Sequence, residues 1–220
     1  QPAVDAEVAT VLSQTLKVDL FVAELLVQRG LRTEMEARRF FRPSLDELHD
    51  PFLMKDMEAA VNRINDAIKK QEGILLFGDY DVDGTTAVAL MYEQLTKFHS
   101  NVRYYIPDRY KEGYGLSQQG IDYAHSEQCS LIITLDCGIK SNQLVSKAKE
   151  LDIDFIICDH HQPGEEIPDG IVLDPKRVDC AYPFKELSGC GVGFKLMQAL
   201  FIDHGVPLDS LFESLDLLAL

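Results

Sequence analysis

Three carboxylates stand at alternate positions, Asp79, Asp81 and Asp83, directly after the apolar run 74–77. If the extended conformation of that run continues, alternate side chains point to one face and the three acids converge. Like charges so close repel one another, and burying them is costly unless a cation compensates. Mg²⁺ and Mn²⁺ prefer carboxylate oxygens, so the stretch predicts a divalent-metal site. The alternative is a solvated acidic turn.

Two later apolar runs, 131–135 and 155–158, also end in acid or histidine. The residues that follow them are Asp136, Asp159, His160 and His161. Ligands of parallel sheets bind beyond the carboxyl ends of the strands, so these groups are expected at one edge with the first three acids. Oxygen-rich sites with one or two imidazoles suit Mn²⁺ or Mg²⁺ better than structural zinc. Two ions ~3.5–4 Å apart would clamp a phosphoryl group and activate a bridging water, which predicts hydrolysis of phosphoesters or phosphoanhydrides.

The chain offers the elements that such a site needs. Continuous apolar runs alternate with helical patterns, which predicts an α/β fold with a parallel sheet and helices on both faces. The expected strands are 74–77, 102–106, 131–135, 155–158 and 171–173. The expected helices are 53–70, 85–98, one beginning near Ser117, 141–150 and 194–204. Residues 1–50 are predicted to form a short helical segment, with a capping box at Thr33 and Glu36, and residues 51–220 to form the α/β domain.

Composition and charge narrow the classes of protein. The 220 residues are 46% apolar and 26% charged, as in soluble globular proteins, and the apolar runs are too short for a membrane span. The five scattered cysteines favour reduced thiols and a cytoplasmic location. A net charge of −15 argues by itself against a nucleic-acid partner. Two segments are locally basic, however: residues 29–42 hold five Arg against two Glu, and residues 101–111 hold three basic residues against Asp108.

Some residues near these basic segments are candidates for substrate contact. The planar guanidinium of Arg109 suits a phosphate, although an ion pair with a nearby acid is the alternative. Tyr110 and Tyr114 can stack on bases or simply pack. The Gly-rich stretch 189–193, with Gly191 at its centre, can cradle phosphate at a helix N-terminus or allow two backbones to approach closely. Residues 29–42 are expected to be a solvated helix face, with contact to an anionic polymer as the alternative.

Together the acidic and histidine motifs resemble motifs I to III of the DHH phosphoesterase superfamily. The three motifs are Asp79-Tyr80-Asp81-Val82-Asp83-Gly84, Asp136-Cys137-Gly138 and Asp159-His160-His161. Flanking segments are similar to those of the superfamily's exonucleases that digest single-stranded DNA from 5′ to 3′ in recombination and repair. These segments are Gln28-Arg29-Gly30, Arg42-Pro43-Ser44-Leu45, Pro107-Asp108-Arg109, Glu112–Leu116 and Ser188–Gly193.

The resemblance implies a set of ligands for two Mn²⁺ or Mg²⁺ ions. Asp79, Asp81 and Asp136 would hold one ion. Asp83, Asp136 and His160 would hold the other, so Asp136 would bridge the two. Single-stranded DNA is the implied substrate, and single-strand-binding protein and helicases are the implied partners of the full-length protein.

The resemblance also implies roles beside the ions. His161 would meet the scissile phosphate, and Asp159 would orient a neighbouring imidazole. Many relatives carry a histidine at the position of Phe77, so Asp79 is expected to supply that ligand here. Residues 215–220 resemble the segment that precedes a fourth acidic motif, and the chain stops before it. We therefore expect an N-terminal fragment that hydrolyses DNA weakly or not at all.

Two other functions stay open at this stage. One is a DHH hydrolase of short oligonucleotides, cyclic dinucleotides or polyphosphate. The other is a non-catalytic scaffold with the same fold. Retention of every acid in motifs I to III argues against the scaffold, and the segments 28–30 and 107–116 favour the exonuclease.

Overall fold

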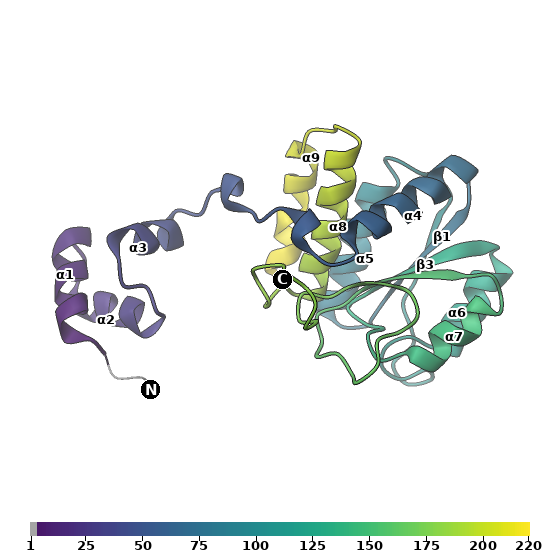
Figure 1. Ribbon diagram of the computed structural model, residues 1–220, viewed down its shortest axis with the longest axis horizontal. Coiled ribbons are helices and arrows are strands. Elements are labelled where there is room, and N and C mark those ends of the chain that lie inside the picture. Colours follow the sequence, from purple (N-terminus) through teal and green to yellow (C-terminus); the bar gives the residue numbers. More distant parts are fainter. Residues whose placement is uncertain (1–3) are drawn as a thin grey trace. The chain divides into compact units, whose positions relative to one another are not determined.

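The structure, a computed structural model, describes residues 4–220, and the chain divides into two compact units. The first unit ends at Leu48 and the second spans His49–Leu220. The helices of the first unit are α1 (Ala6–Leu16), α2 (Leu20–Gln28) and α3 (Glu34–Phe41), as predicted for this segment (Figure 1). At the start of α3, Thr33 and Glu36 form the expected capping box. The helices close around a small core that includes Ala9, Leu12, Ala23 and Val27.

Within the described residues, five strands form one sheet in the second unit. They are β1 (Gly73–Gly78), β2 (Val102–Tyr105), β3 (Cys129–Leu135), β4 (Asp154–Cys158) and β5 (Ile171–Leu173). Their order is β2-β1-β3-β4-β5, and every neighbouring pair is parallel. The predicted parallel sheet is therefore confirmed.

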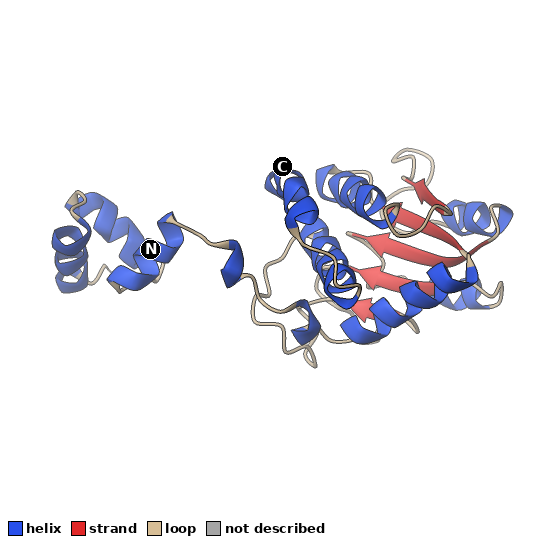
Figure 2. Ribbon diagram, turned by 90° about the horizontal axis from the view of Figure 1, so that it is seen from above, coloured by secondary structure: helices blue, strands red, loops and turns tan. Residues whose placement is uncertain are grey.

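Helices cover both faces of this sheet, as the continuous apolar strands predict (Figure 2). On one face lie α4 (Met57–Lys70), α5 (Val82–Leu95) and α8 (Gly189–Asp203), with α5 and α8 side by side (Figure 1). On the other lie α6 (Gln118–Ser126) and α7 (Asn142–Lys149), which pack on apolar residues of β1, β3 and β4. The short helix α9 (Asp209–Phe212) and a 3-10 segment (Glu213–Ala219) end the chain. None of the described helices combines the length and apolarity that crossing a membrane requires.

Three predicted helix starts were wrong. The helix expected from residue 53 begins at Met57, because Pro51 opens a separate 3-10 turn and Asp56 has a left-handed backbone. The helix expected from residue 85 begins at Val82. The helix expected from Phe194 begins at Gly189, so the Gly-rich stretch is helical rather than a turn; the Ser188 hydroxyl caps it by accepting from the Gly191 N–H.

Candidate metal centre

Four adjacent strands deliver an aspartate to the same row at the carboxyl edge of the sheet. The register pairs Gly78 with Leu135, Leu135 with Cys158, and Cys158 with Leu173. The next residue along each strand is an acid: Asp79, Asp136, Asp159 and Asp174. Backbone hydrogen bonds extend the ladder by one step, for example from the Asp136 N–H to the Cys158 carbonyl at 2.9 Å. All four side chains are buried, so the edge concentrates carboxylates out of water.

The first motif reaches this row by a turn rather than by an extended strand. We expected alternation to place its three acids on one face, but β1 ends at Gly78 and α5 begins four residues later. Asp81 is the N-cap of α5 and accepts from the Gly84 N–H at 3.0 Å. A side chain at Gly84 would meet the backbone of Asp79, since an added Cβ would lie 2.4 Å from its carbonyl oxygen. A tight strand-to-helix turn therefore positions these acids.

One group of possible metal ligands matches the set expected for the first ion. Asp79, Asp81 and Asp136 each offer a carboxylate oxygen, and these oxygens lie within 4.8 Å of one another. The Asp79 Oδ1 accepts from the Gly115 N–H at 3.2 Å, whereas the buried Oδ2 has no hydrogen-bond partner among the described residues. Burial raises the pKa of Asp79, and burial raises the pKa of Asp136 to about 6. An orphaned oxygen in an all-oxygen set fits a hard divalent cation.

Asp136 also belongs to a second group, with His160 and His161. The His160 Nε2 lies 3.1 Å from the Asp136 Oδ1, yet that oxygen has no partner in hydrogen-bond geometry among the described residues. The carboxylate beside it raises the pKa of His160. Asp136 adopts a left-handed backbone, with φ at 61°, which places strain at the residue common to both groups. A shared carboxylate between two donor groups is what a bridging ligand requires.

Asp83, predicted to be a ligand of the second ion, also accepts hydrogen bonds from the backbone at the start of α8. Its Oδ2 and Oδ1 accept from the backbone N–H groups of Gly189 and Cys190, each at 2.7 Å. The Oδ2 lies 3.6 Å from the His160 Nε2, but Asp83 is in neither group of close ligand atoms. Its position in the first turn of α5 directs the carboxylate to the start of α8, where free backbone amides favour negative charge.

Asp159 binds groups around it instead of facing the other acids. Its Oδ1 accepts from the backbone N–H groups of His160 and His161, and lies 2.7 Å from the Nδ1 of His161. Its Oδ2 accepts from the Ile139 N–H at 2.9 Å. The other ring nitrogen of His161, Nε2, lies 3.0 Å from the hydroxyl of Tyr114. Asp159 thus holds His161 in the manner expected of an orienting carboxylate.

The loop after β2 brings candidate substrate residues to the same edge. Its Arg109 lies over the ring of Tyr80, 5.2 Å from the centroid, and has no ion pair among the described residues. Tyr114 meets Tyr80 edge-on at 6.2 Å and bonds His161, so packing describes this tyrosine better than free stacking does. Tyr110 is 95% exposed.

One carboxylate organises this loop. Glu112 accepts from the hydroxyl of Tyr105 at 3.0 Å, from the hydroxyl of Ser117 at 2.6 Å and from the Asp108 N–H at 2.9 Å. These bonds tie the loop to β2 and to the cap of α6, which fixes the segment that carries Arg109 and Tyr114.

The Gly-rich stretch offers no free amide where phosphate contact was predicted. The N–H of Gly191 donates to the Ser188 hydroxyl, and those of Gly189 and Cys190 donate to Asp83. A Cβ added at Gly189 would lie 2.4 Å from the Cβ of Asp136. The alternative interpretation, close approach of two backbones, therefore describes this stretch.

Sequence reasoning missed Asp174. It follows β5 directly and is fully buried, and its Oδ1 accepts from the Lys176 N–H at 2.7 Å. The Oδ2 has no hydrogen-bond partner among the described residues, and burial raises the pKa of Asp174 to about 6. The strand-end rule would have found it, had it been applied to the run 171–173 as it was to the others.

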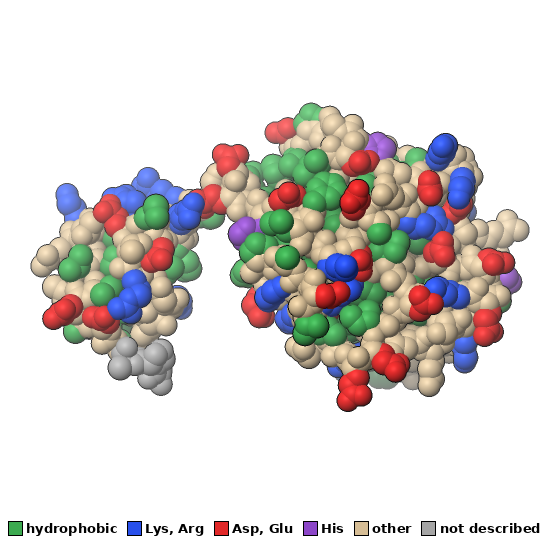
Figure 3. All heavy atoms as spheres, viewed as in Figure 1, with side chains coloured by type: hydrophobic (Ala, Val, Ile, Leu, Met, Phe, Trp, Pro, Cys, Tyr) green, Lys and Arg blue, Asp and Glu red, His purple; other side chains and the backbone are tan. Residues whose placement is uncertain are grey.

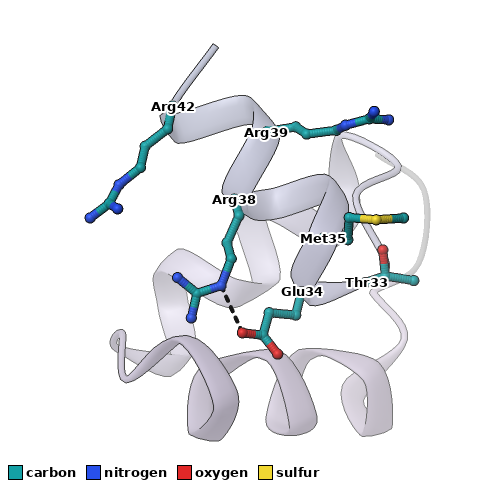
Figure 4. A pocket seen from close by; sticks show the side chains of 6 residues that line it. All are labelled: Thr33, Glu34, Met35, Arg38, Arg39 and Arg42. Atoms are coloured by element: carbon teal, nitrogen blue, oxygen red, sulfur yellow. Dashed lines mark hydrogen bonds and ion pairs between the residues drawn. The ribbon is translucent and has the colours of Figure 1, made fainter. Parts of the chain in front are cut away.

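A broad hollow lies elsewhere in the chain, on α3 of the first unit. Basic side chains gather over α3 in Figure 3, and Figure 4 shows the arginines fanning out from one helix. The residues that line it are Thr33, Glu34, Met35, Arg38, Arg39 and Arg42. Glu34 pairs with Arg38 and Glu47 pairs with Arg39, each at 2.7 Å, so much of the positive charge is neutralised. These pairs are those of a solvated helix face, the interpretation preferred from the sequence.

The fold and site together define an α/β protein with a metal-type donor set at the carboxyl edge of its sheet. Residues 73–220 match the family model described as "DHH family, N-terminal domain". The chain therefore belongs to the DHH family.

Curated relatives with similar sequences are single-stranded-DNA-specific exonucleases named RecJ. The chain is 47% identical to that of Bacillus subtilis over 190 residues, covering 86% of this chain and 24% of the relative. It is 35% identical to that of Escherichia coli over 207 residues, covering 89% and 35%. The chain thus spans about a quarter to a third of the length of these relatives.

Solved structures of RecJ exonucleases are similar to this chain as well. A manganese-bound exonuclease RecJ is 33% identical with a TM-score of 0.68, covering 76% of this chain and 42% of that one. RecJ of Thermus thermophilus in complex with Mn²⁺ is 27% identical with a TM-score of 0.77, covering 97% and 29%.

Proposed function

We propose that this chain carries part of the catalytic centre of a metal-dependent phosphodiesterase that degrades single-stranded DNA from the 5′ end. The observation that carries the proposal is the pair of donor groups that share Asp136 at the sheet edge. The sequence similarity to RecJ exonucleases supports the substrate class. Related proposals are a cytoplasmic role in DNA repair and recombination, with single-strand-binding protein and helicases as partners.

The donor set fits two Mn²⁺ or Mg²⁺ ions. Asp79, Asp81 and Asp136 would hold one, and Asp136 and His160 the other, with Asp83 beside them. When bound, such ions supply Lewis-acid polarisation of a phosphoryl group and a nucleophilic water at neutral pH. The solved RecJ relatives bound to these metals support this choice.

The chain's own residues bind and orient the substrate. Arg109 presents a guanidinium without an acidic partner among the described residues, and its fork can take two phosphate oxygens. His161, held by Asp159, faces the edge beside Asp136, where a scissile phosphate would lie. The rings of Tyr80 and Tyr114 pack edge-on beside His161. Gly191 is left out of the proposed contacts, because its amide is already bonded.

A nuclease assay tests the proposal. Residues 1–220 at high concentration would be incubated with Mn²⁺ and a 3′-labelled single-stranded oligonucleotide, beside the Asp136→Asn variant. We expect slow, metal-dependent shortening from the 5′ end, consistent with weak hydrolysis by this chain alone, and none by the variant. Preference for cyclic dinucleotides, dinucleotides or polyphosphate over the oligonucleotide would instead support another DHH hydrolase. Binding of DNA and metal without turnover of any of these, by this chain and by the full-length protein alike, would support a scaffold.

A further inference from the structure

His161 has the chemistry and the position to become a metal ligand. It belongs with Asp136 and His160 to a group whose ligand atoms lie within 4.8 Å of one another. A second imidazole would change the donor set from mainly oxygen to mixed oxygen and nitrogen. Sites with both imidazole and carboxylate ligands favour Zn²⁺ and other late transition metals, whereas oxygen-rich sites favour Mg²⁺ and Mn²⁺.

Both ring nitrogens of His161 are already engaged. All four bonds to Asp159 come from nitrogen atoms: the backbone amides of His160, His161 and Ile139, and the Nδ1 of His161. A carboxylate oxygen accepts, so Nδ1 is the donor in the bond to Asp159 and carries the ring proton of the corresponding tautomer. The lone pair of that tautomer is on Nε2, where the Tyr114 hydroxyl lies 3.0 Å away and donates.

Packing and hydrogen bonds of its loop hold the Tyr114 hydroxyl in place. Tyr80 packs edge-on against the ring of Tyr114, and the Glu112 hydrogen bonds fix the loop that carries it. Tyr114 is 58% exposed, and its hydroxyl keeps the proton that it donates because the ordinary pKa of a tyrosine is about 10. The Nε2 lone pair is therefore occupied by a hydroxyl that these contacts hold in place.

We propose that Tyr114 is a positioning residue that acts through His161: by occupying Nε2 it withholds this imidazole from the metal and so sets the preference of the centre for Mn²⁺ and Mg²⁺ over Zn²⁺. The inference rests on the metal centre of the proposed function. It assigns a second role to Asp159, which fixes the tautomer that Tyr114 recognises.

The test measures metal affinity, which needs no turnover. Dissociation constants for Mn²⁺ and Zn²⁺ would be determined by calorimetric titration of the chain and of Tyr114→Phe, which removes only the hydroxyl. We expect the variant to favour Zn²⁺ over Mn²⁺ at least about tenfold more than the parent chain does, because Nε2 becomes free to coordinate. Tyr110→Phe is the matched control: it lies in the same loop with its ring in solvent, and its ratio should equal that of the parent.

A second comparison separates this mechanism from a general loosening of the loop. In a His161→Ala background, Tyr114→Phe should leave the Zn²⁺-to-Mn²⁺ ratio unchanged, since the two residues act as a pair. An unchanged ratio in the single variant would overturn the inference while leaving the metal centre intact. An equal change in the His161→Ala background would overturn it too. If the parent chain bound neither metal, the proposed function would fall and the inference with it.

Discussion

The Nε2 of His160 lies 3.1 Å from the Oδ1 of Asp136, at ion-pair distance but outside ideal hydrogen-bond geometry. Asp136 belongs to both groups of possible metal ligands, and this residue is only 1% exposed. Burying a carboxylate with so few hydrogen-bond donors is costly, and a cation bound between the two groups offsets that cost. The geometry thus predicts both an unstable metal-free site and a strong effect of metal on stability.

Asp136→Asn should stabilise the metal-free chain and abolish its response to Mn²⁺. Because the folded pKa of Asp136 is raised to about 6 from 3.8, ionisation at pH 7.5 costs up to about 3 kcal/mol of stability. Urea unfolding with chelator should show the variant more stable by about 1–3 kcal/mol at pH 7.5 and little different at pH 4. Asp66→Asn, at an exposed position of α4, serves as control. A variant less stable than the parent at pH 7.5 would refute this argument.

Stabilisation by Mn²⁺ should fall as the pH falls through about 6. The pKa values of Asp136 and Asp79 are raised in the folded chain. As the pH falls towards these values, protons compete with the metal ion for the carboxylates. The raised pKa of His160 acts in the same direction, because only the neutral imidazole coordinates. Melting temperatures with Mn²⁺ and with chelator should differ strongly at pH 8 and little at pH 5. An equal difference at both values would contradict the assignment.

Asp83→Asn should destabilise the chain by about 1–3 kcal/mol, because two buried backbone donors would face an amide that offers a single acceptor oxygen. Thermal or urea unfolding measures the loss. The effect is specific if Asp66→Asn stays within about 0.5 kcal/mol of the parent. Parent-like stability of Asp83→Asn would mean that α8 does not depend on this carboxylate for its cap.

Gly189→Ala and Gly191→Ala should differ sharply although both place alanine in the first turn of α8. A Cβ at Gly189 would lie 2.4 Å from the Cβ of Asp136, whereas a Cβ at Gly191 would lie 3.3 Å from the flexible side chain of Leu187. We expect the first variant to lose stability and Mn²⁺ binding together and the second to keep Mn²⁺ binding. Equal Mn²⁺ affinity in the two variants would show that Asp136 can move aside.

Arg109→Ala should weaken binding of a single-stranded oligonucleotide about tenfold at low salt, with the loss shrinking as salt rises. Arg103→Ala is the matched control, because Arg103 lies in β2, just before the loop that carries Arg109, and pairs with Glu127 at 3.3 Å. Fluorescence anisotropy with a labelled oligonucleotide gives both affinities. If the two variants lost the same affinity, a general charge effect would replace the specific contact.

The strand-end rule predicted most of this site because it depends on sheet geometry alone. Parallel strands end at one edge, so Asp79, Asp136 and His160 could be brought together from the pattern of apolar runs. The rule could not predict how Asp83 is used, since its partners are the amides of Gly189 and Cys190, more than a hundred residues away.

Local sequence patterns gave a wrong start for α8 and could not predict the contact between Tyr114 and His161. Glycines at 189, 191 and 193 disfavour a helix, yet α8 begins there because Ser188 caps it. Glycine is required at 189 because a Cβ there would collide with Asp136. The Tyr114 hydroxyl bond to His161 was equally beyond reach, because spacing in the sequence does not fix where a loop side chain points.

Diffraction from crystals soaked in MnCl₂, with anomalous differences recorded for manganese, tests the central claim most directly. We expect an anomalous peak bounded by Asp79, Asp81 and Asp136, and a second, with Asp136 in common, beside His160. Peaks confined to surface acids, with the Asp136 Oδ1 still facing His160 alone, would contradict it.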